Sequence, residues 1–379
     1  MATVSFAERL IAWHDGHGRH DLPWQRDPSA YRVWISEVML QQTRVTTVIP
    51  YFGQFTARFP EVGVLAAAPL DEVLALWSGL GYYARARHLH QTAQAVSTQH
   101  GGQFPRDMAT LSALPGIGRS TAAAILTLAM GLRHPILDGN AKRVLARHHA
   151  ITGWPGDAAV ARALWELAER CTPHHGFAAY TQAIMDLGAT LCARARPVCG
   201  DCPVANDCRA RILDRIPEFP GRRTRPTLPV RKTLFVILMN PAGAVFLERR
   251  PTAGIWGGLW AFPECPPELD PLPWAANHYG LVVTHTATWA TVRHTLTHLH
   301  LDITPWLGSV ATADENITTS TTLGHRKTIP KKTIEESPTL WYNPRHDPPG
   351  GLATPVARLM ARLIDQPTFD STAIVRETK

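Results

Sequence analysis

Residues Leu111–Arg147 read LSALPGIGRSTAAAILTLAMGLRHPILDGNAKRVLAR and decide the fold of the first half of the chain. Within them, Leu114–Gly118 forms a short glycine-bearing turn between two helical patterns. Gly116 and Gly118 permit positive φ and a close approach of the backbone to a partner. Unpaired N–H groups at the start of the next helix, Arg119–Met130, attract anions, so the turn is able to hold a phosphate. The alternative is that the proline and glycines only close a corner between two helices.

Two carboxylates are candidates for chemistry. Asp138 follows the second helical pattern, and Glu37 lies on another predicted helix, 30–43. Trp34, Glu37 and Val38 share one face of that helix, so Glu37 lies among apolar neighbours. Burial there would raise its pKa and keep a proton available for general acid catalysis, unless an arginine from elsewhere pairs with it. Two carboxyl groups in different environments are the arrangement that breaks glycosidic bonds.

Length and charge narrow the class of protein. The 379 residues are enough for two or three domains, and the net charge of +7 with a pI near 9.3 suits a polyanionic partner. The N-terminus lacks the basic segment and apolar block of a signal peptide. The most apolar helical stretch, 121–132, is too short to span a bilayer. We therefore expect a soluble, cytoplasmic protein.

The sequence pattern changes once along the chain. Residues 1–215 are helical almost throughout, and 216–231 are rich in proline and arginine, which predicts an extended linker. Residues 232–365 alternate as strands, with a hairpin at 233–247 and a closing helix, which predicts an α+β domain. We expect 366–379 to be a flexible tail.

Four cysteines form the most specific motif in the chain. Their spacing is Cys192-x6-Cys199-x2-Cys202-x5-Cys208. Four thiolates in so short a span indicate metal ligation and not a disulfide framework. Zinc sites usually combine two Cys-x2-Cys hairpins and this motif has one, so an iron–sulfur cluster is favoured and zinc stays open.

Together these motifs resemble the helix-hairpin-helix DNA glycosylase superfamily and, more closely, the MutY-type adenine DNA glycosylase family. The resemblance covers nearly the whole chain. Besides the turn, Asp138 and the cysteines, it rests on residues 22–52, 77–90, 114–126, 135–147, 254–264 and 292–303.

The resemblance implies an activity, the removal of adenine mispaired with 8-oxoguanine or guanine in duplex DNA. The target base has to be flipped out of the duplex. By position, Glu37 is the acid that protonates the adenine, and Asp138 stabilises the oxocarbenium ion or bonds to it covalently. Asn140 holds that geometry, and Ser120 faces the reacting sugar.

The resemblance also implies DNA contacts. Gln41, Gln42 and Tyr82 would probe the strand that carries 8-oxoguanine, with Tyr82 wedged into the base stack. Gly116 and Gly118 would hold a phosphate, and Lys142 would lie near the abasic product. The C-terminal domain resembles a Nudix fold. The glutamate cluster of Nudix pyrophosphatases is not visible in its sequence, so we expect this domain to recognise DNA and not to hydrolyse nucleotides. Leu296, Thr297 and His298 stand where the family has a Phe-Ser-His loop.

The family implies a 4Fe–4S cluster on the four cysteines, a double-stranded DNA partner and a monomer that associates with the nucleoid and not with a membrane. The alternative is an endonuclease III-like glycosylase and lyase that acts on damaged pyrimidines. Those relatives lack the second domain and place a Schiff-base lysine where this chain has Ser120. Ser120 therefore favours a glycosylase with weak lyase activity or none.

Overall fold

A computed structural model describes residues 4–223, 227–310, 338–346 and 348–365. The expected tail, 366–379, lies outside these described residues. The chain divides into two compact units. The N-terminal unit comprises Met1–Ala68 and Arg85–Arg225, and the C-terminal unit comprises Pro69–Ala84 and Pro226–Lys379.

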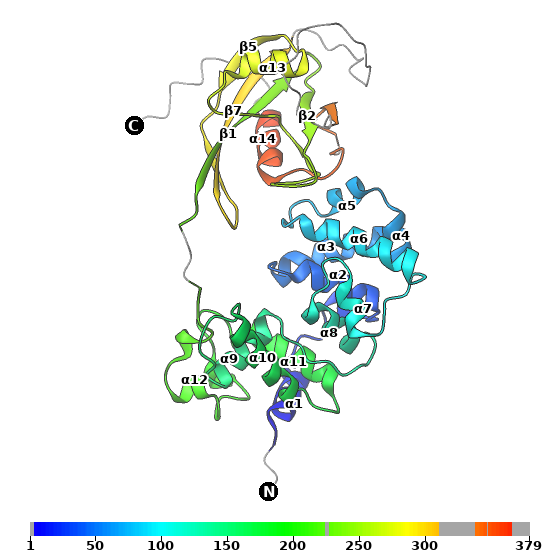
Figure 1. Ribbon diagram of the computed structural model, residues 1–379, viewed down its shortest axis with the longest axis vertical. Helices are drawn as coiled ribbons and strands as arrows, with labels where there is room; N and C mark the ends of the chain where they lie inside the picture. Colours follow the sequence, from blue (N-terminus) through cyan, green and yellow to red (C-terminus); the bar gives the residue numbers. More distant parts are fainter. Residues whose placement is uncertain (1–3, 224–226, 311–337, 347, 366–379) are drawn as a thin grey trace. The chain divides into compact units, whose positions relative to one another are not determined.

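The described N-terminal unit is helical, as the sequence predicts (Figure 1). None of the described helices of the chain is both long and apolar enough to cross a membrane. The helices of this unit are α1 (Phe6–His17), η1 (Pro23–Gln25), α2 (Ala30–Leu40), α3 (Val45–Arg58), α4 (Val62–Ala67), α6 (Ala84–Gln99), α7 (Met108–Ala113), α8 (Arg119–Leu128), α9 (Gly139–His148), α10 (Ala158–Cys171), α11 (Phe177–Ala189), η2 (Cys199–Asp201), α12 (Arg209–Ile212) and η3 (Ile216–Glu218).

Polar side chains fix where these helices begin. Ser5 and Glu8 form a reciprocal capping box at the start of α1. The Ser29 hydroxyl accepts a hydrogen bond from the N–H of Arg32 and starts α2, the helix that carries Glu37. Asp138 caps α9 in the same way. A candidate catalytic residue is thus held by the local geometry of a helix terminus.

The helices of this unit form two groups that meet at α8 (Figure 1). One group contains α2, α3, α7 and α8, and the other contains α1, α9, α10, α11 and α12. α8 packs on α2 and α7 and also contacts α11. The second group surrounds a core that includes Leu10, Leu145, Leu164 and Ile184.

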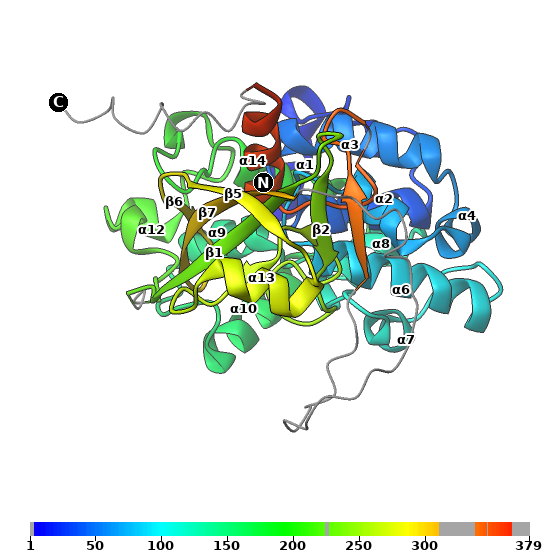
Figure 2. The same ribbon diagram turned by 90° about the horizontal axis from the view of Figure 1, so that it is seen from above.

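The described C-terminal unit is α+β, with helices on opposite sides of a mixed sheet (Figure 2). The sheet order is β3-β2-β1-β7-β5, with β4 paired to β1, β6 to β7 and β8 to β2. Its elements are α5 (Leu70–Leu76), β1 (Val230–Met239), β2 (Val245–Arg249), β3 (Trp260–Ala261), β4 (Glu264–Cys265), α13 (Pro271–Tyr279), β5 (Val283–Thr288), β6 (Val292–Thr295), β7 (His300–Val310), β8 (Thr339–Tyr342) and α14 (Thr354–Asp365).

The expected hairpin is present, but it is not the main pairing of its first strand. β1 and β2 are antiparallel and meet at Met239 and Val245. Along its whole length β1 pairs in parallel with β7, from Val230 opposite His300 to Met239 opposite Ser309. A parallel partner requires a long crossover, which local sequence pattern does not reveal.

Two features differ from the simple order of domain, linker and domain. The segment 69–84 packs with the C-terminal unit although it lies early in the sequence. At the other boundary, Phe219 is buried, and its carbonyl accepts a hydrogen bond of 3.0 Å from Nε of Arg147, within the stretch expected to be a linker. The domain limits drawn from sequence remain a prediction.

Candidate active site

A cavity of about 1090 Å³ opens in the N-terminal unit between the two groups of helices. Its size suits a small organic group such as a nucleoside. Most of the candidate residues for chemistry line it. Its walls include Glu37, Gln41, Gln42, Ser120, Asp138, Asn140 and Lys142, together with His14, Arg19, His20, Trp24, Gln25, Arg143 and Gln182.

Glu37 contributes a carboxyl group from α2 to this cavity. Its neighbours Trp34 and Val38 are buried, as the helical pattern predicts. Burial raises the pKa of Glu37 to about 8, and the nearby charge of Asp138 contributes in the same direction. No cation forms an ion pair with Glu37 among the described residues, so the alternative of a glutamate neutralised by an arginine does not hold. A pKa near 8 favours the protonated form of Glu37 at neutral pH.

Asp138 faces the same cavity in a different environment. Its carboxylate accepts hydrogen bonds from the N–H of Ala141 (2.7 Å) and from Nδ2 of Asn140 (3.1 Å). Burial raises the pKa of Asp138, and these two hydrogen bonds oppose the rise. Glu37 has no such donors among the described residues. The site thus contains two carboxyl groups in different environments. Glu37 is suited to carry a proton, and the Asp138 carboxylate is held by hydrogen-bond donors.

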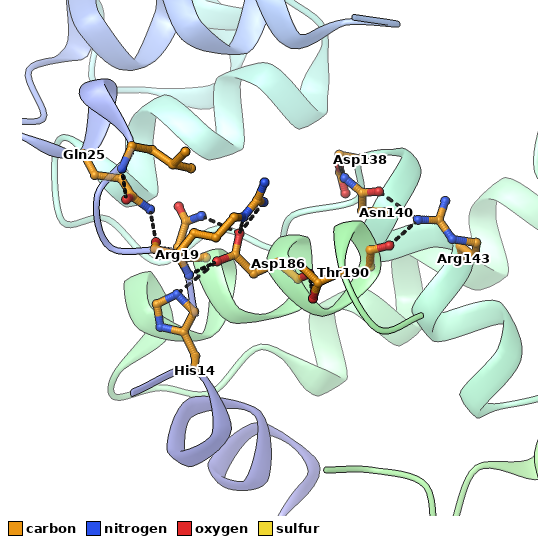
Figure 3. A network of polar contacts seen from close by, with 11 residues as sticks. His14, Arg19, Gln25, Asp138, Asn140, Arg143, Asp186 and Thr190 are labelled. Atoms are coloured by element: carbon orange, nitrogen blue, oxygen red, sulfur yellow. Dashed lines mark hydrogen bonds and ion pairs between the residues drawn. The ribbon is translucent and has the colours of Figure 1, made fainter. Parts of the chain in front are cut away.

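Asn140 is itself held by Arg143 (Figure 3). The Arg143 guanidinium donates to Oδ1 of Asn140 (2.9 Å) and to the carbonyls of Gly188 (2.5 Å) and Cys192 (2.8 Å). Gly188 on α11 lies directly against α9, because a Cβ atom there would stand 2.5 Å from Cβ of Asn140. Sequence reasoning missed both Arg143 and Gly188.

A second polar network is centred on Asp186, and its members His14, Arg19 and Gln182 line the cavity (Figure 3). Asp186 is fully buried and accepts hydrogen bonds from the backbone N–H (2.8 Å) and Nε (3.1 Å) of Arg19. Nε2 of Gln182 donates to it at 3.1 Å, and Nε2 of His14 lies 3.5 Å away. Sequence reasoning missed this network too. The available signal was an aspartate on the apolar pattern AIMDLGA, because an aspartate is rarely buried without partners.

The end of α2 positions the two glutamines. The Arg85 guanidinium donates to the carbonyls of Val38 (2.8 Å), Met39 (2.8 Å) and Gln41 (2.6 Å), which satisfies the last carbonyls of that helix. Gln41 follows as the C-cap residue and Gln42 adopts a positive φ of 59°. Both line the cavity.

The hairpin turn lies just before Ser120, a residue that lines the cavity. Oγ of Ser120 is buried and has no hydrogen-bond partner among the described residues. Gly116 has a φ of 74°, and a Cβ there would stand 2.8 Å from Cβ of His88. Gly118 is different, because it is extended at φ −88° and has open space around it. Both glycines permit a positive φ, but only Gly116 adopts one, whereas Gly118 is the extended N-cap of α8.

The four cysteines of the motif line one small apolar pocket in the N-terminal unit. Burial raises the pKa of Cys202 to about 11, and the charges of the other three thiols add to the rise, so all four groups lie close together. Arg147 donates a hydrogen bond of 3.3 Å to Sγ of Cys192. Among the described residues no three His, Cys, Asp or Glu side chains converge closely enough to hold a single ion.

Comparisons with known proteins agree with this geometry. The model of the HhH-GPD superfamily of base excision DNA repair proteins matches residues 35–170, and that of the NUDIX domain matches 234–362. The chain is 34% identical over 360 residues to the adenine DNA glycosylase of Buchnera aphidicola subsp. Acyrthosiphon pisum, covering 95% of this chain and 98% of that protein. It is 36% identical to the human adenine DNA glycosylase, covering 79% of this chain and 66% of that one.

The chain belongs to the adenine DNA glycosylase family. Among solved structures it is similar to a thermostable thymine-DNA glycosylase, with a TM-score of 0.50, 26% identity and coverage of 55% of this chain and 95% of that one. The predicted fold class, a helix-hairpin-helix glycosylase domain followed by a Nudix-like domain, is thereby confirmed. The cavity around Glu37 and Asp138 is thus in a base excision DNA repair enzyme.

Adenine DNA glycosylases are generally iron–sulfur proteins, and the cysteine pocket fits such a group. Its four thiols line one apolar pocket, and soft thiolates are the ligands that iron–sulfur clusters take. Cys171 and Cys265 do not line the pocket.

The remaining predicted DNA-contact residues lie in the C-terminal unit and do not line the cavity. Leu296, Thr297 and His298 form the tip of the hairpin between β6 and β7, closed by a 2.9 Å hydrogen bond from the N–H of Leu296 to the carbonyl of Leu299. Thr297 and His298 are exposed. Tyr82 is exposed as well, on the turn that follows α5. Their roles as DNA contacts remain predictions.

Proposed function

We propose that this chain removes adenine mispaired with 8-oxoguanine or guanine in duplex DNA. The observation that carries the proposal is the cavity shared by Glu37 and Asp138, with the protonated form of Glu37 favoured at neutral pH and Asp138 held by hydrogen-bond donors. Family membership supports the choice of adenine as the excised base. Hydrolysis of an N-glycosidic bond needs both functions, because the leaving base requires a proton and the sugar develops positive charge.

The reaction begins when adenine flips out of the duplex into the cavity. Glu37 donates its proton to a ring nitrogen of the adenine, which weakens the bond between the base and C1′ of the sugar. The Asp138 carboxylate then stabilises the oxocarbenium ion or bonds to it, and water completes the hydrolysis. Asn140 keeps the Asp138 carboxylate in place through its 3.1 Å hydrogen bond. Ser120 lines the same cavity, and its hydroxyl has no hydrogen-bond partner among the described residues.

DNA contacts surround this centre. The N–H groups at the start of α8, behind Gly116 and Gly118, bind a phosphate. Lys142 lies on the cavity wall, where its ammonium group meets the abasic product. Gln41, Gln42, Tyr82 and the tip formed by Leu296, Thr297 and His298 contact the strand opposite the adenine. The enzyme acts as a monomer on chromosomal DNA in the nucleoid.

Cys192, Cys199, Cys202 and Cys208 hold a 4Fe–4S cluster. When bound, such a cluster would be held by these four thiolates and would cross-link the loop 192–208. Arg143 ties this loop to the site, because it donates both to the carbonyl of Cys192 and to Asn140.

Single-turnover release of adenine from a duplex with one A·8-oxoguanine pair tests the proposal. We expect Glu37→Gln and Asp138→Asn each to lose at least about a hundredfold in rate, the size of a general acid or charge-stabilising contribution, while duplex binding is retained. Glu166→Gln, which changes an exposed carboxyl group on α10, is the matched control and should react normally. Near-normal turnover by either cavity variant would refute its assigned role.

The endonuclease III-like alternative predicts a different outcome in the same reaction. A lyase needs an amine nucleophile that forms a Schiff base, and Ser120 supplies only a hydroxyl. Strand cleavage should therefore be weak, and any protein that borohydride traps on the DNA should be trapped through the Lys142 amine beside the abasic product. Efficient trapping on a damaged pyrimidine substrate, without adenine release, would favour the alternative.

A further inference from the structure

The turn that presents Tyr82 is packed against the C-terminal fold. We define the Tyr82 turn as residues 77–83, which follow α5 and belong to the C-terminal unit. The Tyr83 hydroxyl donates a hydrogen bond of 2.9 Å to the carbonyl of Leu352, and Oγ of Ser78 lies 3.4 Å from the same oxygen. Leu352 lies just before α14 and bridges to Trp260. Both ends of the turn are thus tied to one backbone atom of the C-terminal fold.

The preceding helix, α5, is held by an ion pair and by close packing. Asp71 in its first turn accepts a hydrogen bond of 2.6 Å from the Arg249 guanidinium on β2. Leu74, about one helical turn after Asp71, is fully buried. A Cβ at Gly351 would stand 2.9 Å from Cβ and 3.0 Å from the carbonyl oxygen of Leu74. The chain at Gly351 therefore lies against α5 at a distance that only glycine allows.

The turn itself is in a conformation that a tyrosine rarely adopts. Gly79, Gly81 and Tyr82 have positive φ values of 99°, 73° and 51°. Internal hydrogen bonds close the turn. Among them, Nε1 of Trp77 donates to the carbonyl of Gly81 at 3.1 Å, and the N–H of Gly79 donates to the Tyr83 hydroxyl at 3.4 Å. A non-glycine residue stays at positive φ only where surrounding contacts enforce it. The Tyr83 hydroxyl makes both an internal contact and the contact to Leu352, so it links the turn to the C-terminal fold.

We propose that the C-terminal fold positions Tyr82 for insertion into DNA, with Arg249, Gly351 and the Leu352 carbonyl as the positioning groups. This inference rests on the proposed function, in which Tyr82 contacts the strand opposite the adenine, and on the wedge role that the family resemblance implies for Tyr82. It assigns the Nudix-like fold a second task besides reading the lesion at the tip of its β6–β7 hairpin. The C-terminal unit then carries both the β6–β7 hairpin tip that reads the lesion and Tyr82, the side chain that inserts into the base stack.

Amide hydrogen exchange in the DNA-free full-length protein tests the positioning. Arg249→Gln removes the ion pair with Asp71, and Gly351→Ala forces the chain away from Leu74. We expect both variants to speed exchange across residues 77–83 several-fold while α2 exchanges as in the wild type. Arg231→Gln is the matched control, because it removes an ion pair with Glu264 in the same unit and leaves the turn untouched. Unchanged exchange at 77–83 in both variants would overturn the inference, whatever base the enzyme excises.

Single-turnover adenine release tests the consequence. We expect Arg249→Gln and Gly351→Ala to react roughly tenfold more slowly, since small misplacements of a positioning group cost that much or more. Adding Tyr82→Ala to Arg249→Gln should cost little further, because both changes remove the same wedge. The double variant Asp71→Arg with Arg249→Asp should recover part of the rate.

The outcomes separate this inference from the proposed function. If exchange rises but the Arg249→Gln variant releases adenine at the wild-type rate, the turn is anchored without guiding Tyr82, and the inference fails while the glycosylase proposal stands. If the wild type releases no adenine, the proposed function fails, and the exchange result still decides whether the C-terminal fold holds the turn.

Discussion

Glu37→Gln should make the protein more stable and inactive at the same time. Burial raises the pKa of Glu37 from its usual value of 4.5 to about 8. A carboxyl group whose pKa is higher in the folded than in the unfolded protein makes its full contribution to the free energy of unfolding below pH 4.5, where it is protonated in both states. That contribution is lost as pH rises to about 8, because the unfolded chain ionises first. Glutamine keeps the shape of the side chain and does not ionise, so the variant escapes this loss.

The size of the effect follows from the same shift. A difference between 4.5 and about 8, at about 1.36 kcal/mol per pKa unit, corresponds to about 5 kcal/mol as an upper bound. Glu37 lines an open cavity and is only half-buried, so solvent reduces the penalty, and we expect ~1–2 kcal/mol. For a unit of this size that raises the unfolding temperature by roughly 2–8 °C.

Calorimetric unfolding between pH 4.5 and 9 is the assay. The gap in unfolding temperature between Glu37→Gln and the wild type should be near zero at the acid end, widen as pH rises and level off above the pKa of Glu37. Glu166→Gln should show no such widening. In parallel, the wild-type single-turnover rate should fall above pH 8, about tenfold per pH unit, as the Glu37 proton is lost. A gap that does not depend on pH, or a rate that stays constant to pH 9.5, would refute the reasoning.

Three further variants test the hairpin, the cysteine pocket and the contact between α9 and α11. In a duplex-binding titration, Gly116→Ala should bind several-fold more weakly than the wild type. It should also lower the free energy of unfolding by about 1–2 kcal/mol, because alanine resists the positive φ at this position. Gly118→Ala is the control and should bind normally, because Gly118 has an extended backbone with open space around it. Cys202→Ser should abolish the visible absorption of an iron–sulfur protein and its bound iron, and Cys171→Ser, outside the pocket, should keep both. Gly188→Ala should push Asn140 aside, lower the unfolding free energy by about 1–3 kcal/mol and slow adenine release, and a wild-type rate would contradict the role of this helix contact.

The sequence alone determined what depends on neighbours along the chain. Ser29 and Asp138 cap helices because an N-cap needs only its own side chain and the N–H groups two or three residues later. The face of α2 that carries Glu37 follows from helical periodicity, and the cysteine motif from its spacing. The resemblance then assigned roles to these residues, and family membership was confirmed by the comparisons.

Only the tertiary structure decided which groups meet. The raised pKa of Glu37 depends on every atom that excludes water from it, and Asp138 reaches the same cavity from a helix a hundred residues later. The buried Asp186 network, the contact of Gly188 with Asn140 and the packing of residues 69–84 on the C-terminal fold involve partners far apart in sequence. Local pattern cannot supply such pairings, because desolvation and close packing are set by the whole surrounding volume and not by the order of residues.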